Sequence, residues 1–260
     1  MSGFSDANTF LKSDLFTAQY PPNPSTARGV GTQINSHPDK PLIIYPSGKF
    51  VVVRDLSDVS KSFVYRGHSF DPTVAAFSPS GAWIASADAG GKVKVWAWSH
   101  PDKLTKLDTQ LFSGAVADLC WSPDNNKIVA VGDNGGGLQM KTFTYDTGNS
   151  LGEMVGHNKR VTACAYKPTR PFKIMTGGED LKTVFFSGPP FKMGHSNNTH
   201  TNFVNAVRYT PDGARIVSVG SDKKIQLYDG VTGEPTEAIE NAHAASIYQV
   251  RTCICMIFQT

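Results

Sequence analysis

Histidine, serine or threonine, aspartate and aromatic residues recur together along the sequence. One set, His200, Ser218, Asp222 and Tyr228, has separations of 18, 4 and 6 residues. A second set, His157, Thr176, Asp180 and Phe186, has separations of 19, 4 and 6 residues. Histidine, serine and aspartate together are the chemistry of a nucleophilic hydrolase. Because the same set recurs at a fixed distance, we interpret it instead as a structural network in which buried polar side chains satisfy one another.

A third set is less regular. It begins at His68 and includes Ser86 and Trp96, but Gly90 stands where the aspartate is expected and Asp88 comes two residues early. In the second set, the phenylalanine cannot donate the hydrogen bond that a tryptophan would. We therefore expect networks of unequal size, and we assign none of these residues a catalytic role.

Three other motifs suggest chemistry but lack the partners that it needs. Residues 146–148 (Asp-Thr-Gly) match the aspartic-protease tripeptide, which requires a second carboxylate, and no second copy is present. Residues 135–137 (Gly-Gly-Gly) are not followed by the Gly-Lys-Ser/Thr of a phosphate-binding loop. Cys253 and Cys255 have no second ligand pair at zinc spacing. We expect no cofactor and no metal site.

The elements that must position these residues form a repeat. Proline-containing turns begin at residues 78, 122, 167 and 210, which are 44, 45 and 43 residues apart. The histidines at 68, 157, 200 and 243 are 89, 43 and 43 residues apart, so one histidine is missing near residues 114–115. Short β-branched and aromatic runs separate these marks. A period of 43–45 residues with four short strands predicts an all-β, WD-repeat β-propeller.

The repeat sets the expected domain organisation. Residues 1–27 form a proline-containing lead-in, and residues 28–250 form a partial propeller that ends in an incomplete sixth unit. The expected blades are residues 28–60, 61–104, 105–150, 151–190, 191–234 and, in part, 235–250. Residues 251–260 are apolar and cysteine-rich, and we expect an off-pattern tail there.

Composition excludes several other classes of protein. The net charge of +3 gives no electrostatic footprint for nucleic acid. The apolar runs are far shorter than the roughly 18–20 residues that cross a bilayer. The N-terminus has no secretory signal, so we expect a cytoplasmic protein with reduced cysteines and no membrane partner.

Several longer motifs resemble one family. They include residues 146–153 (Asp-Thr-Gly-Asn-Ser-Leu-Gly-Glu), 167–172 (Lys-Pro-Thr-Arg-Pro-Phe), 188–192 (Gly-Pro-Pro-Phe-Lys), 200–204 (His-Thr-Asn-Phe-Val) and 227–234 (Leu-Tyr-Asp-Gly-Val-Thr-Gly-Glu). Over about residues 27–250 the sequence is similar to the actin-interacting protein 1 family, also called WD repeat-containing protein 1. The resemblance implies a monomer that binds cofilin-decorated actin filaments, promotes their disassembly and belongs to the actin cytoskeleton.

The resemblance also implies binding residues. The family's surface maps here onto Glu179, Lys192, Met193 and Phe203, with methionine in place of an aromatic residue. For Glu179 and Lys192 the alternative is an ordinary solvated turn charge, and for Phe203 it is packing between blades. The family has two seven-bladed propellers, so the resemblance also implies that this sequence is a truncated first propeller with an exposed strand edge, prone to aggregation.

Two alternative functions remain open at this point. A WD-repeat scaffold for another protein complex would use the same loops, which carry exposed aromatic and charged residues. An enzyme would need a set of polar residues that does not follow the repeat, and the sequence offers none.

Overall fold

The computed structural model describes residues 20–252 except residues 59 and 99–103. In these residues the regular elements are strands, which form five four-stranded antiparallel sheets in chain order. The first two sheets comprise β1 (Asn35–Ser36), β2 (Leu42–Ser47), β3 (Phe50–Asp55) and β4 (Ser62–Tyr65), then β5 (Pro72–Phe77), β6 (Trp83–Asp88), β7 (Lys92–Ala97) and β8 (Thr105–Gln110). The third comprises β9 (Val116–Trp121), β10 (Lys127–Gly132), β11 (Met140–Thr144) and β12 (Ser150–Glu153). The last two comprise β13 (Val161–Tyr166), β14 (Lys173–Gly178), β15 (Thr183–Ser187) and β16 (Lys192–Asn197), then β17 (Val204–Tyr209), β18 (Arg215–Gly220), β19 (Ile225–Asp229) and β20 (Pro235–Ile239).

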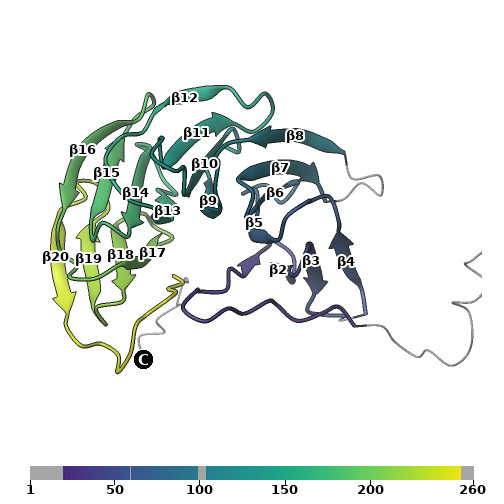
Figure 1. The fold of residues 1–260 in the computed structure, drawn as a ribbon, viewed down its shortest axis with the longest axis horizontal. Coiled ribbons are helices and arrows are strands. Elements are labelled where there is room, and N and C mark those ends of the chain that lie inside the picture. The colour runs from purple at the N-terminus through teal and green to yellow at the C-terminus, as the bar shows by residue number, and fades with distance from the viewer. Residues whose placement is uncertain (1–19, 59, 99–103, 253–260) are drawn as a thin grey trace, which may run out of the picture.

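The five sheets follow one another around an arc, with the first strand of each sheet innermost (Figure 1). Consecutive inner strands contact each other, from β5 through β9 and β13 to β17. The arc is an open ring, and segments from near both ends of the described chain cross its opening (Figure 1). The expected WD-repeat β-propeller architecture is confirmed, with five blades in the described part of the chain.

In the second to fifth sheets the outer strand is the most exposed of the four. The inner strands β5, β9 and β17 have the same alternation, with only their second and fifth residues partly exposed. The second strands are almost wholly buried, whereas the outer strand β20 is exposed throughout. Strands that face sheets on both sides read as continuous Val, Ile and Ala runs, which explains the short apolar segments of the sequence.

The core lies between neighbouring sheets rather than in one central mass. One apolar cluster joins the second and third sheets, another the third and fourth, and another the fourth and fifth. Burying each Val, Ile or Phe in these layers contributes roughly 1.5–3 kcal/mol. Each blade is therefore stabilised chiefly by the blades next to it, as in other repeat proteins.

The proline-containing motifs form tight turns between the first and second strands. Backbone hydrogen bonds close three of them, from Gly81 to Ser78, from Asn125 to Ser122 and from Gly213 to Thr210, at 2.8, 3.0 and 2.8 Å. The fourth residue of each turn has a positive φ of 70°, 61° or 72°. Glycine and asparagine tolerate this left-handed conformation, which accounts for their place in the motif.

The sheets are offset from the blades that we expected. Each expected boundary, at residues 60, 104, 150, 190 and 234, falls before or at the start of a fourth strand that pairs with the three preceding strands. Residues 235–239, assigned to a sixth unit, are therefore β20 of the fifth sheet. Strand pairing follows spatial adjacency, and a sequence repeat can begin at any strand of a blade.

Residues 240–252 run along the free flank of the fifth sheet (Figure 1). Backbone N–H groups of Ala242 and Ile247 donate to the carbonyls of Lys223 and Gly220, at 2.9 and 3.1 Å. Ile247 and Val250 pack with apolar residues of β17 and β18. Thr252, which we placed in the off-pattern tail, instead follows this ordered path; residues 253–260 lie outside the described residues.

Candidate functional site

The set that begins at His200 forms a continuous network in the fifth sheet. Nδ1 of His200 lies 2.8 Å from Oδ2 of Asp222, and its Nε2 lies 2.6 Å from Oγ of Ser218. The hydroxyl of Tyr228 lies 3.1 Å from the same serine oxygen. That hydroxyl also meets Oγ1 of Thr183 on the fourth sheet at 3.2 Å, so the network joins two blades.

The set that begins at His157 has the same arrangement with one donor fewer. His157 lies 2.8 Å from Oδ1 of Asp180 and 2.9 Å from Oγ1 of Thr176. Phe186 is buried beside them without a polar group, and the threonine hydroxyl also donates to the carbonyl of Val184 at 3.3 Å. The aromatic donor is therefore missing, as the sequence predicts, and the threonine hydroxyl has a backbone carbonyl as a further acceptor.

In the second sheet the network is complete, contrary to our expectation of a missing aspartate. Asp88, at the end of β6, lies 2.9 Å from Nδ1 of His68. Ser86 lies 2.7 Å from Nε2 of the histidine and accepts from Nε1 of Trp96 at 3.0 Å. The aspartate occupies the last position of the strand, where its carboxylate also accepts from the N–H of Gly90 at 3.0 Å. A spacing rule that required residue 90 missed this residue.

The third sheet replaces the polar network with apolar residues. Phe112 stands four residues before β9, as His157 and His200 stand before β13 and β17. Ala130 and Phe143 take the places of the hydroxyl and the aromatic donor, and all three replacements are buried in one cluster. The missing histidine is therefore at residue 112 and not at 114–115.

Burial explains why these networks are structural. Ser86 and Ser218 are fully buried, so no substrate carbonyl can reach their hydroxyls. Burial lowers the pKa of His68 and His200 below the ordinary 6.5, although Asp88 and Asp222 oppose the shift. A neutral histidine that bonds to an aspartate and a hydroxyl satisfies all three groups at neutral pH.

Two of the four predicted binding residues lie at the same end of the sheets. Glu179 follows β14 and Phe203 precedes β17. Both line a cavity of about 500 Å³ in the central channel, the space that the inner strands of the sheets surround. Phe203 is 43% exposed. The carboxylate of Glu179 lies 3.7 Å from the guanidinium of Arg160, whose Nε is buried without a hydrogen-bond partner among the described residues.

The other two predicted residues lie elsewhere. Lys192 and Met193 begin the outer strand β16, where Lys192 pairs with Ser187 at the end of β15 that is distant from Glu179. The five residues of β15 separate the two ends by roughly 13 Å at about 3.3 Å per residue. Both side chains are exposed, Met193 by 50%. The structure thus divides the four residues into two pairs.

The inner strands line the channel with two positions each. The second residues, among them Thr73, Thr162 and Asn205, line the 500 Å³ cavity, which we call the upper cavity. The fifth residues, among them Cys120 and Arg208, line a second cavity of about 360 Å³, which we call the lower cavity. These are the two partly exposed positions of β5, β9 and β17, whose side chains reach the two cavities.

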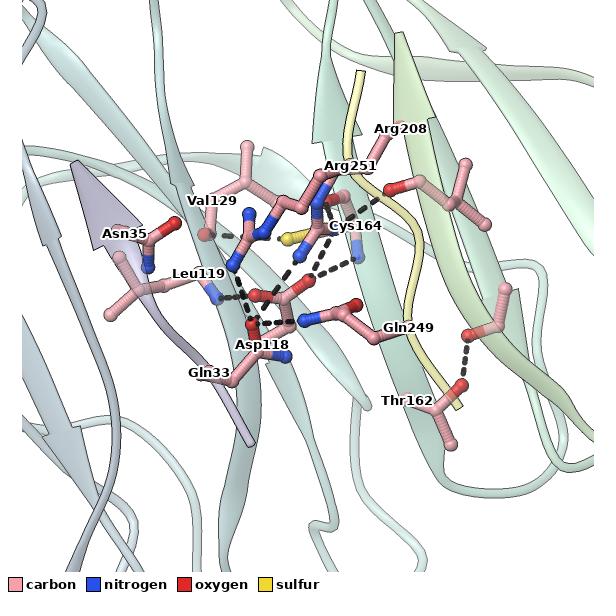
Figure 2. A network of polar contacts seen from close by, with 12 residues as sticks. Gln33, Asn35, Asp118, Leu119, Val129, Thr162, Cys164, Arg208, Gln249 and Arg251 are labelled. Carbon is pink, nitrogen blue, oxygen red and sulfur yellow. Dashed lines mark hydrogen bonds and ion pairs between the residues drawn. The ribbon is translucent and has the colours of Figure 1, made fainter. Parts of the chain in front are cut away.

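A charged network includes lining residues of the lower cavity, and Figure 2 shows its hydrogen bonds. NH1 of Arg208 donates to Oδ2 of Asp118 at 2.9 Å and to the carbonyl of Cys164 at 3.2 Å. The same carboxylate oxygen accepts the N–H of Cys164 at 3.3 Å, so it bridges β9, β13 and β17. A charged residue inside an apolar inner strand was the signal in the sequence, and we did not interpret it.

Comparison with known proteins places the chain among WD-repeat proteins. The model of the WD domain, G-beta repeat, matches residues 60–97, 148–186 and 191–229. Actin-interacting protein 1-2 of Arabidopsis thaliana is 43% identical over 227 residues, which are 86% of this chain and 37% of that protein. The 66 kDa stress protein of Physarum polycephalum and WD repeat-containing protein 1 of Gallus gallus are each 38% identical, over 88% and 87% of this chain and 38% and 37% of their own lengths.

Over most of its length the chain is similar to proteins of the actin-interacting protein 1 family, and it carries the WD repeats that the family model matches. It spans less than two fifths of the length of these family members. The matched repeat at residues 191–229 runs from β16 through β19, so the family's repeat begins with the outer strand of the preceding blade. This explains the offset between the repeat units and the sheets. No segment in the described part of the chain forms an apolar helix of membrane-spanning length.

Proposed function

We propose that this chain binds actin filaments and acts with cofilin to promote filament disassembly. The observation that carries the proposal is its similarity to proteins named actin-interacting protein 1, at 43% identity in Arabidopsis thaliana and 39% in Drosophila melanogaster. The proposed role is one of binding in the cytoplasm and not of catalysis, with the blades serving as a rigid support.

The end of the propeller that carries Phe203 and Glu179 is the proposed main contact. Phe203 presents an exposed aromatic ring beside the upper cavity. Aromatic side chains bury a large area on association and are frequent among the residues that dominate binding. Glu179 lies beside Arg160, and the two charges together favour a partner surface of complementary charge.

Lys192 and Met193 form the proposed second contact. They lie on an outer strand, where an unbranched and polarizable methionine adapts to a partner's surface. An interface of ordinary size buries about 800 Å² on each partner, and the two ends of β15 are only roughly 13 Å apart, so we propose that one partner reaches both ends of the blade. A filament is large enough to meet both.

Co-sedimentation with actin filaments, with and without cofilin, tests the proposal. We expect the chain to enter the pellet with cofilin-decorated filaments and to do so less with bare filaments. If the chain stays in the supernatant in both cases, the proposal is wrong. The alternative, a WD-repeat scaffold for another complex, would then be favoured.

A further inference from the structure

The lower cavity holds more positive than negative charge. Its lining includes two positively charged residues, Arg208 and Arg251, and one negatively charged residue, Asp118. By contrast, the upper cavity has one charge of each sign, Arg160 and Glu179. Asp118 pairs with Arg208. Arg251 is exposed and donates to the carbonyl of Ile34 at 2.6 Å, but it has no carboxylate partner among the described residues, and a guanidinium group in this situation favours an anion.

The repeat places the two guanidinium groups close together. Arg208 is the fifth residue of β17. Arg251 lies 43 residues later, which is one repeat, in the segment of residues 240–252 that runs along the free flank of the fifth sheet. NH2 of each arginine lies 3.4 Å from Oε1 of Gln33. Desolvation in the channel, followed by repulsion from Arg208, lowers the pKa of Arg251 to about 10.

One neutral oxygen accepts from three converging donors (Figure 2). Besides the two arginines, Nε2 of Gln249 donates to Oε1 of Gln33 at 2.9 Å. Three donors of this kind would bind a negatively charged oxygen more strongly than they bind the neutral amide oxygen of Gln33, because hydrogen bonds to ionised acceptors are stronger. Two buried tyrosines of the same cavity wall, Tyr166 and Tyr209, also have hydroxyls without a partner among the described residues.

We propose that the lower cavity is a binding site for a small oxyanion, a phosphate or a carboxylate, held between the guanidinium groups of Arg208 and Arg251. A guanidinium fork fits either group in two-point contact. The 360 Å³ of the cavity accommodates an anion of this size next to the side chains that bind it. Gln33 also lines the upper cavity, but Glu179 and Phe203 of the proposed filament contact take no part in the anion site, so either proposal can fail without the other.

Calorimetric titration of the whole chain with inorganic phosphate tests the site, with acetate in a second arm and chloride at matched ionic strength as the reference. We expect saturable binding of phosphate or acetate above the chloride reference, and the arm that binds more tightly identifies the chemistry. Arg251→Gln is expected to weaken binding about tenfold or more, since it removes a charge-assisted contact. Arg215→Gln, an exposed arginine outside both cavities, is the matched control and should bind as the parent chain does.

A second variant keeps the test decisive if the first one folds poorly. Gln33→Glu places a carboxylate where the three donors converge, so we expect a higher melting temperature in chloride and loss of the phosphate and acetate response. The proposal is overturned if neither anion binds above the chloride reference. It is also overturned if Arg251→Gln binds as the parent chain does, or if Gln33→Glu leaves the anion response unchanged.

Discussion

Asn205 donates a hydrogen bond of 2.8 Å from Nδ2 to the carbonyl oxygen of Ile247. Thr162 makes the same contact one blade earlier, to the carbonyl of Val204, and Thr73 makes it three blades earlier, with Oγ1 lying 2.6 Å from the carbonyl of Val116. In each pair the donor is the second residue of one inner strand and the acceptor is 42 or 43 residues later. The segment that begins at Ile247 therefore occupies the place of a next inner strand.

Asn205→Ala should loosen this segment. The side chain also donates to Oγ of Ser221 at 3.0 Å, so two hydrogen bonds are lost. We expect a decrease of about 1–2 kcal/mol in the free energy of unfolding, at about 1 kcal/mol for each net hydrogen bond. Chemical denaturation measures it, and amide hydrogen exchange should show faster exchange at Ile247. Asn198→Ala, at an exposed residue of the fourth sheet's final loop, is the control, and equal losses in both variants would contradict the assignment.

Tyr228→Phe should weaken the contact between the fourth and fifth blades. The hydroxyl meets Ser218, Thr183 and Thr199 at 3.1, 3.2 and 2.7 Å, so its removal leaves buried groups without a partner. We expect a loss of about 1–3 kcal/mol in stability. Tyr145→Phe is the control, because the Tyr145 hydroxyl has no side-chain hydrogen bond among the residues that the structure describes, and it should change stability by less than about 0.5 kcal/mol. Unfolding curves that shift equally for the two variants would show that the network adds nothing.

Phe112→His should not restore a polar network in the third blade. Ala130 offers no hydroxyl, so the imidazole would be buried in an apolar cluster without a partner on the sheet. We expect a loss of about 2–4 kcal/mol, the size of an unsatisfied buried polar group together with lost apolar contacts. Phe112→Leu keeps the apolar character and should cost less. Thermal denaturation distinguishes the two, and a histidine variant at least as stable as the leucine variant would contradict this explanation.

The pH dependence of stability follows from the buried histidines. Folding lowers the pKa of His68 and His200 below 6.5, so the unfolded chain takes up protons at a higher pH than the folded chain. The contribution of these two histidines to the free energy of unfolding is therefore constant above pH 6.5 and decreases as the pH falls below that value. Urea denaturation at about pH 7.5 and about pH 5.5 measures the difference. A midpoint that rises at the lower pH would contradict the sign.

Most of the fold could be predicted from the sequence because the repeat leaves marks in residue type. The proline turns and the histidine spacing depend on local backbone geometry and on buried hydrogen bonds, and both recur in every regular blade. Strand pairing does not depend on the repeat's starting point, so residues 235–239 were assigned to the wrong sheet. Asp88 was missed because a carboxylate two residues earlier reaches the same histidine.

The candidate site was less predictable than the fold. The sequence motifs bring Glu179 and Phe203 to one end of the propeller, but the hairpin of β15 and β16 carries Lys192 and Met193 to the other end. The channel network joins residues as far apart as Gln33 and Arg251, a distance along the chain at which spacing carries no information. Arg208 could have been noticed as a charge within a buried strand, but its partner Asp118 is 90 residues away.

The most direct measurement of the central claim compares two double variants in co-sedimentation with cofilin-decorated actin filaments. Glu179→Gln with Phe203→Ala alters the proposed contact, whereas Glu234→Gln with Val231→Ala alters an exposed acid and an exposed apolar residue at the opposite end of the fifth sheet. We expect the first double variant to bind the filaments with at least about tenfold lower affinity, as substitutions of hot-spot residues do. The second double variant should bind as the parent chain does. Equal binding by the two double variants would contradict the claim.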